Sequence, residues 1–313
     1  MSAVVSVEPF IALQRSFIIC FTVFFMLIFH NLGVNDFADV FVKLVKFFLS
    51  SIMILICLIF LSNPYFVDYK GFFINPNSFG LFSASLFISL FILVNNKNKI
   101  LIFIIGLFFI GISSSRTALI SFFLAMVIIF FSKFIFKHKV LYFFIFLFLI
   151  LFSFLNIYVM VFLDLSSYNE IVMHYTGKNL LSGRNEVWQI LIPIIQQKPF
   201  FGWGGGINIQ DITYYSYSAH NAYIQYIVQV GFFGVSLIIL FFAMIWLSLL
   251  KGENIYSGYS LGLIFWIFFV QNFEITFLQN NIALSLPVII LFSYFLGKSK
   301  RTIKLKTMRV FEK

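Results

Sequence analysis

Charged residues are scarce in this chain: Asp, Glu, Lys and Arg together make up only 10% of its 313 residues. Hydrophobic residues account for 61%, and the mean hydropathy is +1.02. A soluble domain carries about 25% charged and roughly 45–50% apolar residues. The shortage of charge therefore excludes an ordinary soluble domain. It predicts an all-α integral membrane protein, a polytopic bundle of helices.

Cysteine and clustered metal ligands are also scarce. The two cysteines, Cys20 and Cys57, both lie inside apolar runs, and we interpret them as small buried hydrophobes rather than a disulfide or a metal pair. No His, Cys, Asp and Glu residues have the spacing of metal ligands, and no Asp-x-Asp-like pair is available for a metal-bound sugar nucleotide. These absences favour a reaction without a metal or another cofactor.

Acidic residues are outnumbered by basic ones, which gives the chain a net charge of +10. The basic residues lie in short stretches between apolar runs and in the tail from Lys298 to Lys313. This distribution is the positive-inside pattern of membrane proteins. It favours an orienting role over binding to a polyanion, so we predict no nucleic-acid partner.

Apolar runs long enough to cross a bilayer, which takes roughly 20 residues, recur along the chain. Ser113-Ser114-Ser115-Arg116 divides one of these runs, and two crossings joined by a tight turn is the interpretation that fits its length. Nine spans are predicted, at residues 10–30, 40–62, 79–95, 99–115, 117–136, 139–163, 222–250, 257–276 and 281–297.

The distribution of basic residues also predicts the orientation of these spans. If the spans alternate, most basic residues fall on one side, which makes the C-terminus cytoplasmic and places the polar loop 164–220 outside or in the periplasm. Nine spans then put the N-terminus outside, although no cleavable signal peptide opens the chain. Either the first span is misjudged or helices precede it. We predict a single membrane domain, 1–313, with this loop as its insertion.

Arg116 is a charge at the end of two apolar runs, where charges are costly and often functional. Together with the preceding Ser115, its guanidinium could hold a phosphate or pyrophosphate bidentately. The alternative is an arginine that extends to the membrane interface only for its own solvation.

A second arginine, Arg184, opens an apolar helical pattern inside the loop. Ser182 is the expected N-cap, and Pro193 should bend the helix or end its first half. We expect this helix to lie along the membrane surface, with Trp188 at the level of the headgroups and Arg184 directed toward the bundle. The alternative is an anchoring helix with a solvated arginine.

Glycines follow this helix in the stretch Gly202-Trp203-Gly204-Gly205-Gly206. No strand precedes them and no Gly-Lys-Ser or Gly-Lys-Thr ends them, so they are a weak signal for nucleotide binding. They fit better a turn that lets the backbone approach a ligand or another helix.

His220 is predicted to open the next helix, where the helix dipole would favour the neutral imidazole that a general base requires. A structural histidine is the alternative. Glu274, near the end of the predicted span 257–276, could orient this base, pair with an arginine, or simply pair at a helix end. The remaining histidines are weaker candidates: His30 ends the first span, His138 lies in a basic turn, and His174 lies in an unstructured part of the loop.

Taken in order, five motifs resemble the O-antigen ligase and O-antigen polymerase (Wzy-type) membrane proteins. Each motif alone is degenerate, and the ordered set covers roughly residues 70–250. The motifs are Gly71-Phe72-Phe73-Ile74-Asn75-Pro76-Asn77, Ser115-Arg116-Thr117-Ala118-Leu119, Ser182-Gly183-Arg184 with Trp188, Lys198-Pro199-Phe200-Phe201-Gly202-Trp203-Gly204, and His220-Asn221-Ala222-Tyr223 with Gly231 and Gly234.

The resemblance implies a polytopic protein of the bacterial inner membrane that transfers glycans from undecaprenyl pyrophosphate without metal or nucleotide. It implies that Arg116 and Arg184 hold the pyrophosphate and that His220 activates the acceptor hydroxyl. A chain-length regulator and a flippase are candidate partners beside the lipid bilayer. The candidate substrate-binding residues are Asn77, Ser115, Trp188, Trp203, Asn221 and Glu274.

Polymerase and ligase share all of these motifs. The abundance of Phe suggests an AT-rich coding sequence, which we associate with acquired antigen loci and which favours a polymerase, with a ligase as the second choice. A transporter of lipid-linked glycans would predict inverted repeats, broken helices and intramembrane carboxylates, and the sequence shows none of these patterns. A non-catalytic scaffold or remnant is the remaining alternative.

Overall fold

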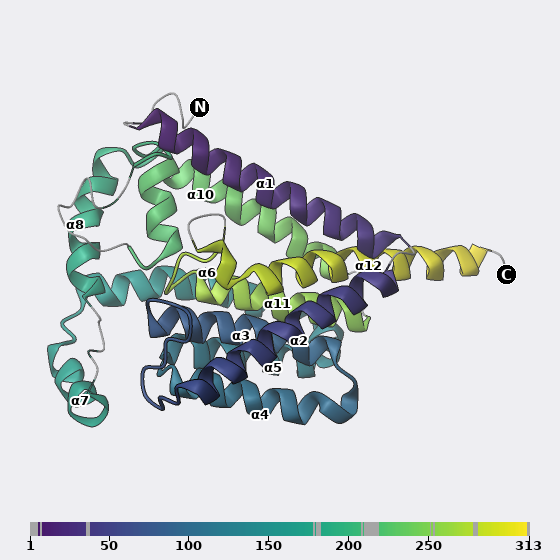
Figure 1. Cartoon of the computed structure of the whole chain (residues 1–313). Helices are drawn as coiled ribbons and strands as arrows, with labels where there is room; N and C mark the ends of the chain where they lie inside the picture. The colour runs from purple at the N-terminus through teal and green to yellow at the C-terminus, as the bar shows by residue number, and fades with distance from the viewer. Residues whose placement is uncertain are drawn as a thin grey trace. The chain divides into compact units, whose positions relative to one another are not determined.

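The computed structural model describes residue 6 and residues 8–35, 38–177, 179, 183–207, 209, 219–250, 252, 254–277 and 281–311. All regular elements within these ranges are helices, which confirms the all-α prediction. They are α1 (Pro9–Val34), α2 (Ala38–Ser62), α3 (Pro76–Leu93), α4 (Asn96–Ile112), α5 (Arg116–Lys137), α6 (Lys139–Phe162), α7 (Ser166–Thr176), α8 (Arg184–Gln197), α10 (Ala222–Leu249), α11 (Ile255–Val270), the 3₁₀-helix η1 (Ile282–Leu284) and α12 (Leu286–Phe311) (Figure 1).

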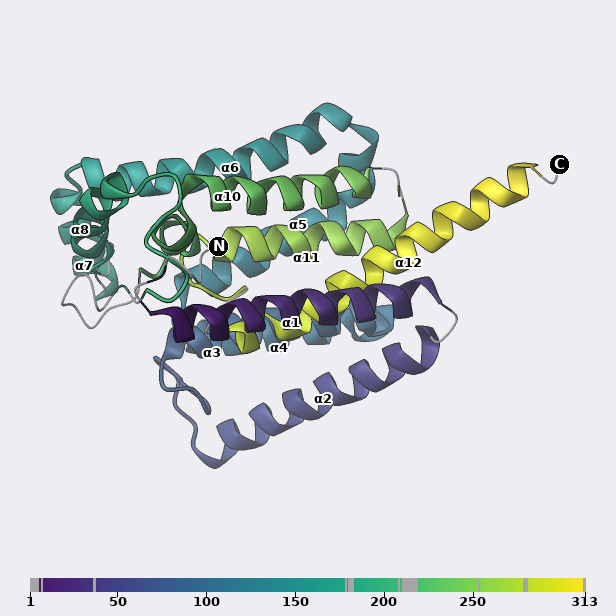
Figure 2. The same cartoon turned by 90° about the horizontal axis from the view of Figure 1, so that it is seen from above.

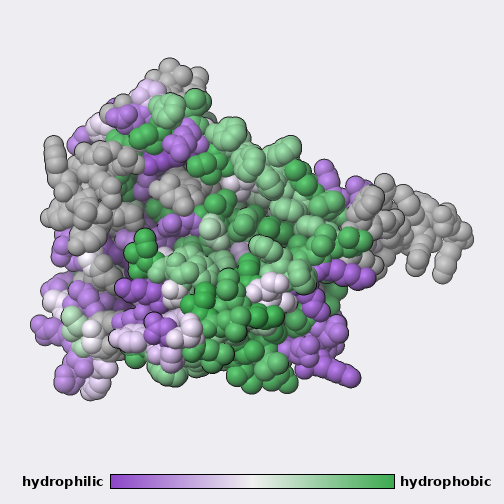
Figure 3. Space-filling view, in the orientation of Figure 1, coloured by the Kyte–Doolittle hydropathy of each residue, from purple (hydrophilic) through white to green (hydrophobic). Residues whose placement is uncertain are grey.

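Six of the described helices, α1, α2, α3, α5, α6 and α10, are long and apolar enough to cross a membrane. The predicted count of nine is not confirmed. Helices α4 and α11 have only 17 and 16 residues, and α12 continues from its apolar first half into the basic tail. Hydrophobic residues cover the middle of the face over α2 to α5, as expected for helices that contact lipid (Figure 3).

Helix boundaries confirm one prediction and correct others. The apolar run around the three serines does form two helices, α4 and α5, joined by the short turn at residues 113–115. His30 lies inside α1 rather than at its end, and His174 lies on α7 rather than in an unstructured stretch. The first correction arises because α1 continues past its predicted end, and the second because a separate short helix, α7, follows α6.

The chain forms two compact units. We call residues 1–20, 143–244 and 271–275 the site unit, and residues 21–142, 245–270 and 276–313 the bundle unit. In the bundle unit, α3 is buried over most of its length and packs on α2, α4, α5 and α12, while α11 packs on α5 and α12 (Figures 1 and 2). Gly258 and Gly262 of α11 lie directly against Ser132 and Ile129 of α5, so small residues bring these two helices close.

The site unit contains α7, α8, most of α6 and α10, the start of α1, and the segment 271–275. Helices α6 and α10 are linked by a side-chain hydrogen bond between Ser153 and Tyr223. Several of its segments are irregular, and hydrogen bonds from polar side chains fix their positions. The single membrane domain with one inserted loop stays a prediction.

Candidate functional site

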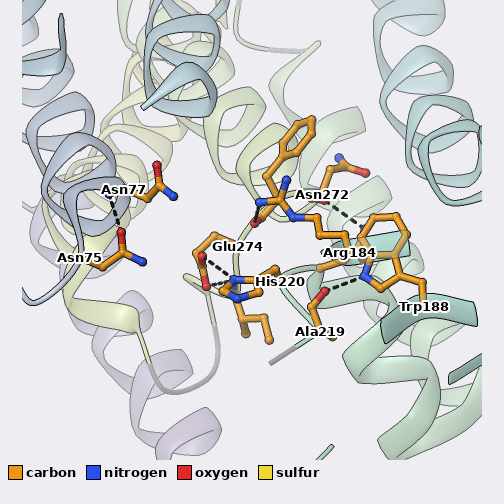
Figure 4. A network of polar contacts seen from close by, with 11 residues as sticks. Asn75, Asn77, Arg184, Trp188, Ala219, His220, Asn272 and Glu274 are labelled. Atoms are coloured by element: carbon orange, nitrogen blue, oxygen red, sulfur yellow. Dashed lines mark hydrogen bonds and ion pairs between the residues drawn. The ribbon is translucent and has the colours of Figure 1, made fainter. Parts of the chain in front are cut away.

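A histidine and a carboxylate form the chemical centre of the site unit. His220 Nδ1 lies 3.1 Å from Glu274 Oε2, and the side chains are 35% and 15% exposed (Figure 4). The carboxylate is thus shielded from water, while the imidazole is still accessible. Of the roles that the sequence left open for Glu274, orienting the histidine is the one that this contact supports.

Glu274 does not lie on a helix, which corrects the predicted span 257–276. Helix α11 ends at Val270, and the next residues bind the start of α10 instead. Gln271 O accepts a hydrogen bond from Ala222 N at 2.9 Å, and Asn272 O accepts from Asn221 Nδ2 at 3.1 Å. These two bonds place Glu274 beside His220.

His220 precedes α10 rather than opening it, which corrects a second prediction. Asn221 caps the helix, because its Oδ1 accepts from Ile224 N at 3.1 Å. His220 itself has φ +45°, in the left-handed region that side-chain-bearing residues seldom adopt. Backbone strain of this kind collects at functional sites, where the surrounding structure holds it in place.

Arg184 is the first residue of α8 and reaches the segment that carries Glu274. Its Nη2 donates to Phe273 O at 3.2 Å, and its guanidinium lies 5.9 Å from the centre of the Phe273 ring. Figure 4 shows Arg184, His220 and Glu274 together. The predicted N-cap Ser182 lies outside the described residues; Gly183, with φ +73°, occupies the capping position.

Trp188 is fully buried, so its indole does not contact the headgroups as expected, while the position of α8 along the membrane surface stays a prediction. Its Nε1 donates to Ala219 O at 2.7 Å, which holds the residue directly before His220. The predicted apolar face of α8 turns inward against the unit instead of toward lipid. The helix also continues through Pro193 to Gln197 rather than ending its first half there.

Asn221, like Trp188, supports His220 from a buried position. Its side chain is fully buried, and both ends of the amide are hydrogen-bonded to backbone groups on either side of the site. These hydrogen bonds favour a role for Asn221 in holding His220 and Glu274 in place over direct contact with a substrate.

The backbone around the glycine stretch 202–206 lies close to α10. This agrees with the interpretation of the stretch as a turn that lets the backbone approach a ligand or another helix. Helix α10 is kinked at Gly231, which has φ +66°, and a Cβ there would lie 2.2 Å from Phe200 O. The kink exposes backbone groups that the loop satisfies: Trp203 N donates to Val228 O at 2.8 Å, and Phe232 N donates to Pro199 O, also at 2.8 Å.

The Trp203 side chain closes the same loop against α8. Its Nε1 donates to Ile194 O at 3.0 Å, in the last turn of that helix. Lys198 Nζ lies 4.1 Å from the centre of the indole ring, at cation–π distance. Contact between Trp203 and a substrate stays a prediction.

Arg15 is a structural residue of the site that sequence reasoning missed. It is buried on α1, and its Nη1 donates to Gly205 O at 2.8 Å and to Ile207 O at 2.9 Å. Ser6 Oγ accepts from Gly206 N at 3.0 Å in the same loop. A charge inside an apolar run was the available signal.

Three predicted site residues belong to the bundle unit. Arg116 is exposed at the first position of α5, and Ser115 caps that helix by accepting from Ala118 N at 3.4 Å. Asn77 is exposed in the first turn of α3, and its N–H donates to Asn75 Oδ1 at 2.8 Å. The convergence of Arg116 with Arg184 and His220 stays a prediction.

Within the described part of the chain, no group of three or more His, Cys, Asp and Glu residues could hold a metal ion. Residues 101–239 match the model of the O-antigen ligase family. The match confirms the resemblance to O-antigen ligases and polymerases, and it includes Arg116, Arg184 and His220. Neither a curated protein nor a solved structure matches the chain.

Proposed function

We propose that this protein polymerises oligosaccharide repeat units carried on undecaprenyl pyrophosphate, at the outer face of the bacterial inner membrane. The similarity to the O-antigen ligase family supports glycan transfer as the class of reaction. The apolar helices support a membrane location. The observation that carries the proposal is the contact between His220 and Glu274, with Arg184 on the adjacent carbonyl.

The His220–Glu274 contact favours the histidine tautomer that the reaction needs. A carboxylate only accepts hydrogen bonds, so the ring proton resides on Nδ1 and the lone pair on Nε2. The acceptor sugar hydroxyl passes its proton to Nε2 as its oxygen attacks the anomeric carbon of the donor glycan. The Glu274 carboxylate stabilises the imidazolium that forms.

The bond from the anomeric carbon to the pyrophosphate oxygen breaks in the same step, and negative charge develops on the departing lipid pyrophosphate. Arg184 provides a guanidinium whose plane is anchored by Phe273 O. Such a fixed donor stabilises the charge of the leaving group without having to reorganise. Arg116 is proposed as the second cation on the pyrophosphate.

Complementation of a polymerase-deleted strain, with the glycan ladder read on a gel, tests this assignment. His220→Gln and Arg184→Ala should each remove the ladder, because one lacks the base and the other the leaving-group cation. Glu274→Gln should weaken the ladder by about 10²-fold or more, since the tautomer is no longer enforced.

His174→Gln is the matched control, because His174 is exposed on α7 and is not part of the His220–Glu274 dyad. It should leave the ladder unchanged at equal protein abundance in the membrane. A full ladder with both His220→Gln and Arg184→Ala would refute the catalytic assignment.

A ligase that transfers finished glycan to lipid A–core is the second candidate, and the description of the matching family favours it. In the same strain, the molecule to which the glycan is attached distinguishes the two functions. Long chains on the polyprenyl carrier support a polymerase, whereas transfer of preformed chains to lipid A–core supports a ligase.

A further inference from the structure

A pocket of about 500 Å³ lies within the site unit and is lined by residues other than His220, Glu274 and Arg184. The end of α6, the start of α7 and the first turns of α8 form its walls. This volume falls in the range of small-ligand sites, roughly 300–1,000 Å³. The polar side chains that line it include Asp164, Asn169, Asn179, Asn185, Glu186 and Gln189.

Local hydrogen bonds shape this pocket. Gln189 Nε2 donates to Val161 O at 3.3 Å, which ties α8 to the last turn of α6. Asp164 Oδ1 accepts from Ser166 N at 3.0 Å, and this backbone hydrogen bond, with a further bond to the Ser166 side chain, lowers the pKa of the carboxyl. Asp164 is therefore an anion held in a defined orientation at neutral pH.

The polar groups of the lining are complementary to a ligand with several hydroxyl groups. Side-chain amides donate and accept hydrogen bonds at once, and carboxylates accept two or more, which matches neighbouring hydroxyl groups on a sugar ring. Two carboxylates, Asp164 and Glu186, line the pocket, and none of the described residues that line it is basic. A sugar with a carboxylate or phosphate would be repelled, whereas a neutral or amino sugar would not.

The pocket and the dyad share the first turn of α8. Arg184 points to the carbonyl beside Glu274, and the next two residues, Asn185 and Glu186, line the pocket. This shared turn connects the pocket to the proposed reaction site.

We propose that this pocket is a sugar-binding subsite that selects a neutral or amino sugar of the glycan and rejects an acidic one. The proposal rests on the function proposed above, since it assigns the pocket to the substrate of that site. Its residues are distinct from His220, Arg184 and Glu274.

Saturation-transfer NMR of the full chain in lipid nanodiscs tests the subsite. The probes are the methyl β-glycosides of N-acetylglucosamine, glucosamine and glucuronic acid. Saturation should transfer to the first two and not to the glucuronide. Asn185→Ala with Gln189→Ala should weaken binding of the neutral probe about tenfold, as expected for lost hydrogen bonds.

The double variant Asp164→Asn with Glu186→Gln removes both negative charges from the pocket and keeps the size of the two side chains. It should admit the glucuronide while binding of the N-acetylglucosaminide stays within about twofold. Equal transfer to all three glycosides in the unmodified protein, or no change in preference in this variant, would overturn the proposal. If the alanine variant fails to fold, the change in sugar preference of the charge variant still tests the proposal.

The two proposals fail separately. His220→Gln should remove the ladder and leave glycoside binding unchanged. If it leaves the ladder intact while the probes bind as expected, the catalytic function is wrong and the pocket stands. If it removes the ladder while the probes show no selectivity, the pocket is wrong and the function stands.

Discussion

The contacts that stabilise the site unit internally differ from those that stabilise the bundle unit. In the bundle unit, helices such as α3 and α11 are buried along their length and pack through apolar and small residues. In the site unit, irregular segments depend on single polar side chains such as Arg15, Trp188 and Asn221. A close-packed helix interface spreads its stabilisation over many contacts, whereas an irregular segment loses its position when one buried hydrogen bond is removed.

The largest expected effect is that of a methyl group at the kink of α10. Gly231→Ala places a Cβ 2.2 Å from Phe200 O at a φ of +66°, which should destabilise the site unit by about 3 kcal/mol or more. Unfolding in mixed micelles with increasing dodecyl sulfate would measure this loss.

Gly111→Ala in the bundle unit is its control, because a Cβ there meets nothing within 4 Å and the residue lies inside α4. We expect a change within about 1 kcal/mol, in the stabilising direction. Equal destabilisation by both substitutions would remove the contrast between the units.

A smaller effect is expected from two helix caps. Asn75→Ala in the bundle unit removes only the N-cap bond of α3 and should cost about 1 kcal/mol. Asn221→Ala in the site unit removes a cap and the bond to Asn272 O, so the cost should be about 2 kcal/mol. Equal losses in the same unfolding assay would show that the second bond contributes nothing.

Trp188→Phe is expected to cost less stability than Gly231→Ala or Asn221→Ala, because it keeps an aromatic ring and removes the donor to Ala219 O. Unfolding free energy should fall by about 1 kcal/mol, while the glycan ladder should weaken further than the folded fraction explains, because His220 loses its neighbouring support. Trp266→Phe is the matched control: that indole is fully buried in the bundle unit, and its Nε1 has no hydrogen-bond partner among the described residues. It removes the same ring volume but no hydrogen bond, so its cost in unfolding free energy should be smaller and the ladder should be unchanged at equal protein abundance.

Local patterns in the sequence predicted the features that depend on neighbouring residues. The apolar runs predicted helices, the three serines predicted the turn before α5, and the apolar spacing in α8 predicted which of its residues are buried. The glycines after α8 predicted a close backbone approach, because only glycine lacks the Cβ that would obstruct it.

Composition and periodicity by themselves determined that this chain is helical and suited to a membrane, and the ordered motifs determined its family resemblance. The tertiary structure alone decided that Trp188 is buried, that Glu274 leaves its helix, and that Glu274 meets His220 across 54 positions of sequence. The physical reason is that periodicity shows which side chains share a face but not what covers that face. The partner of a buried polar group is set by long-range contacts that fold the chain back on itself.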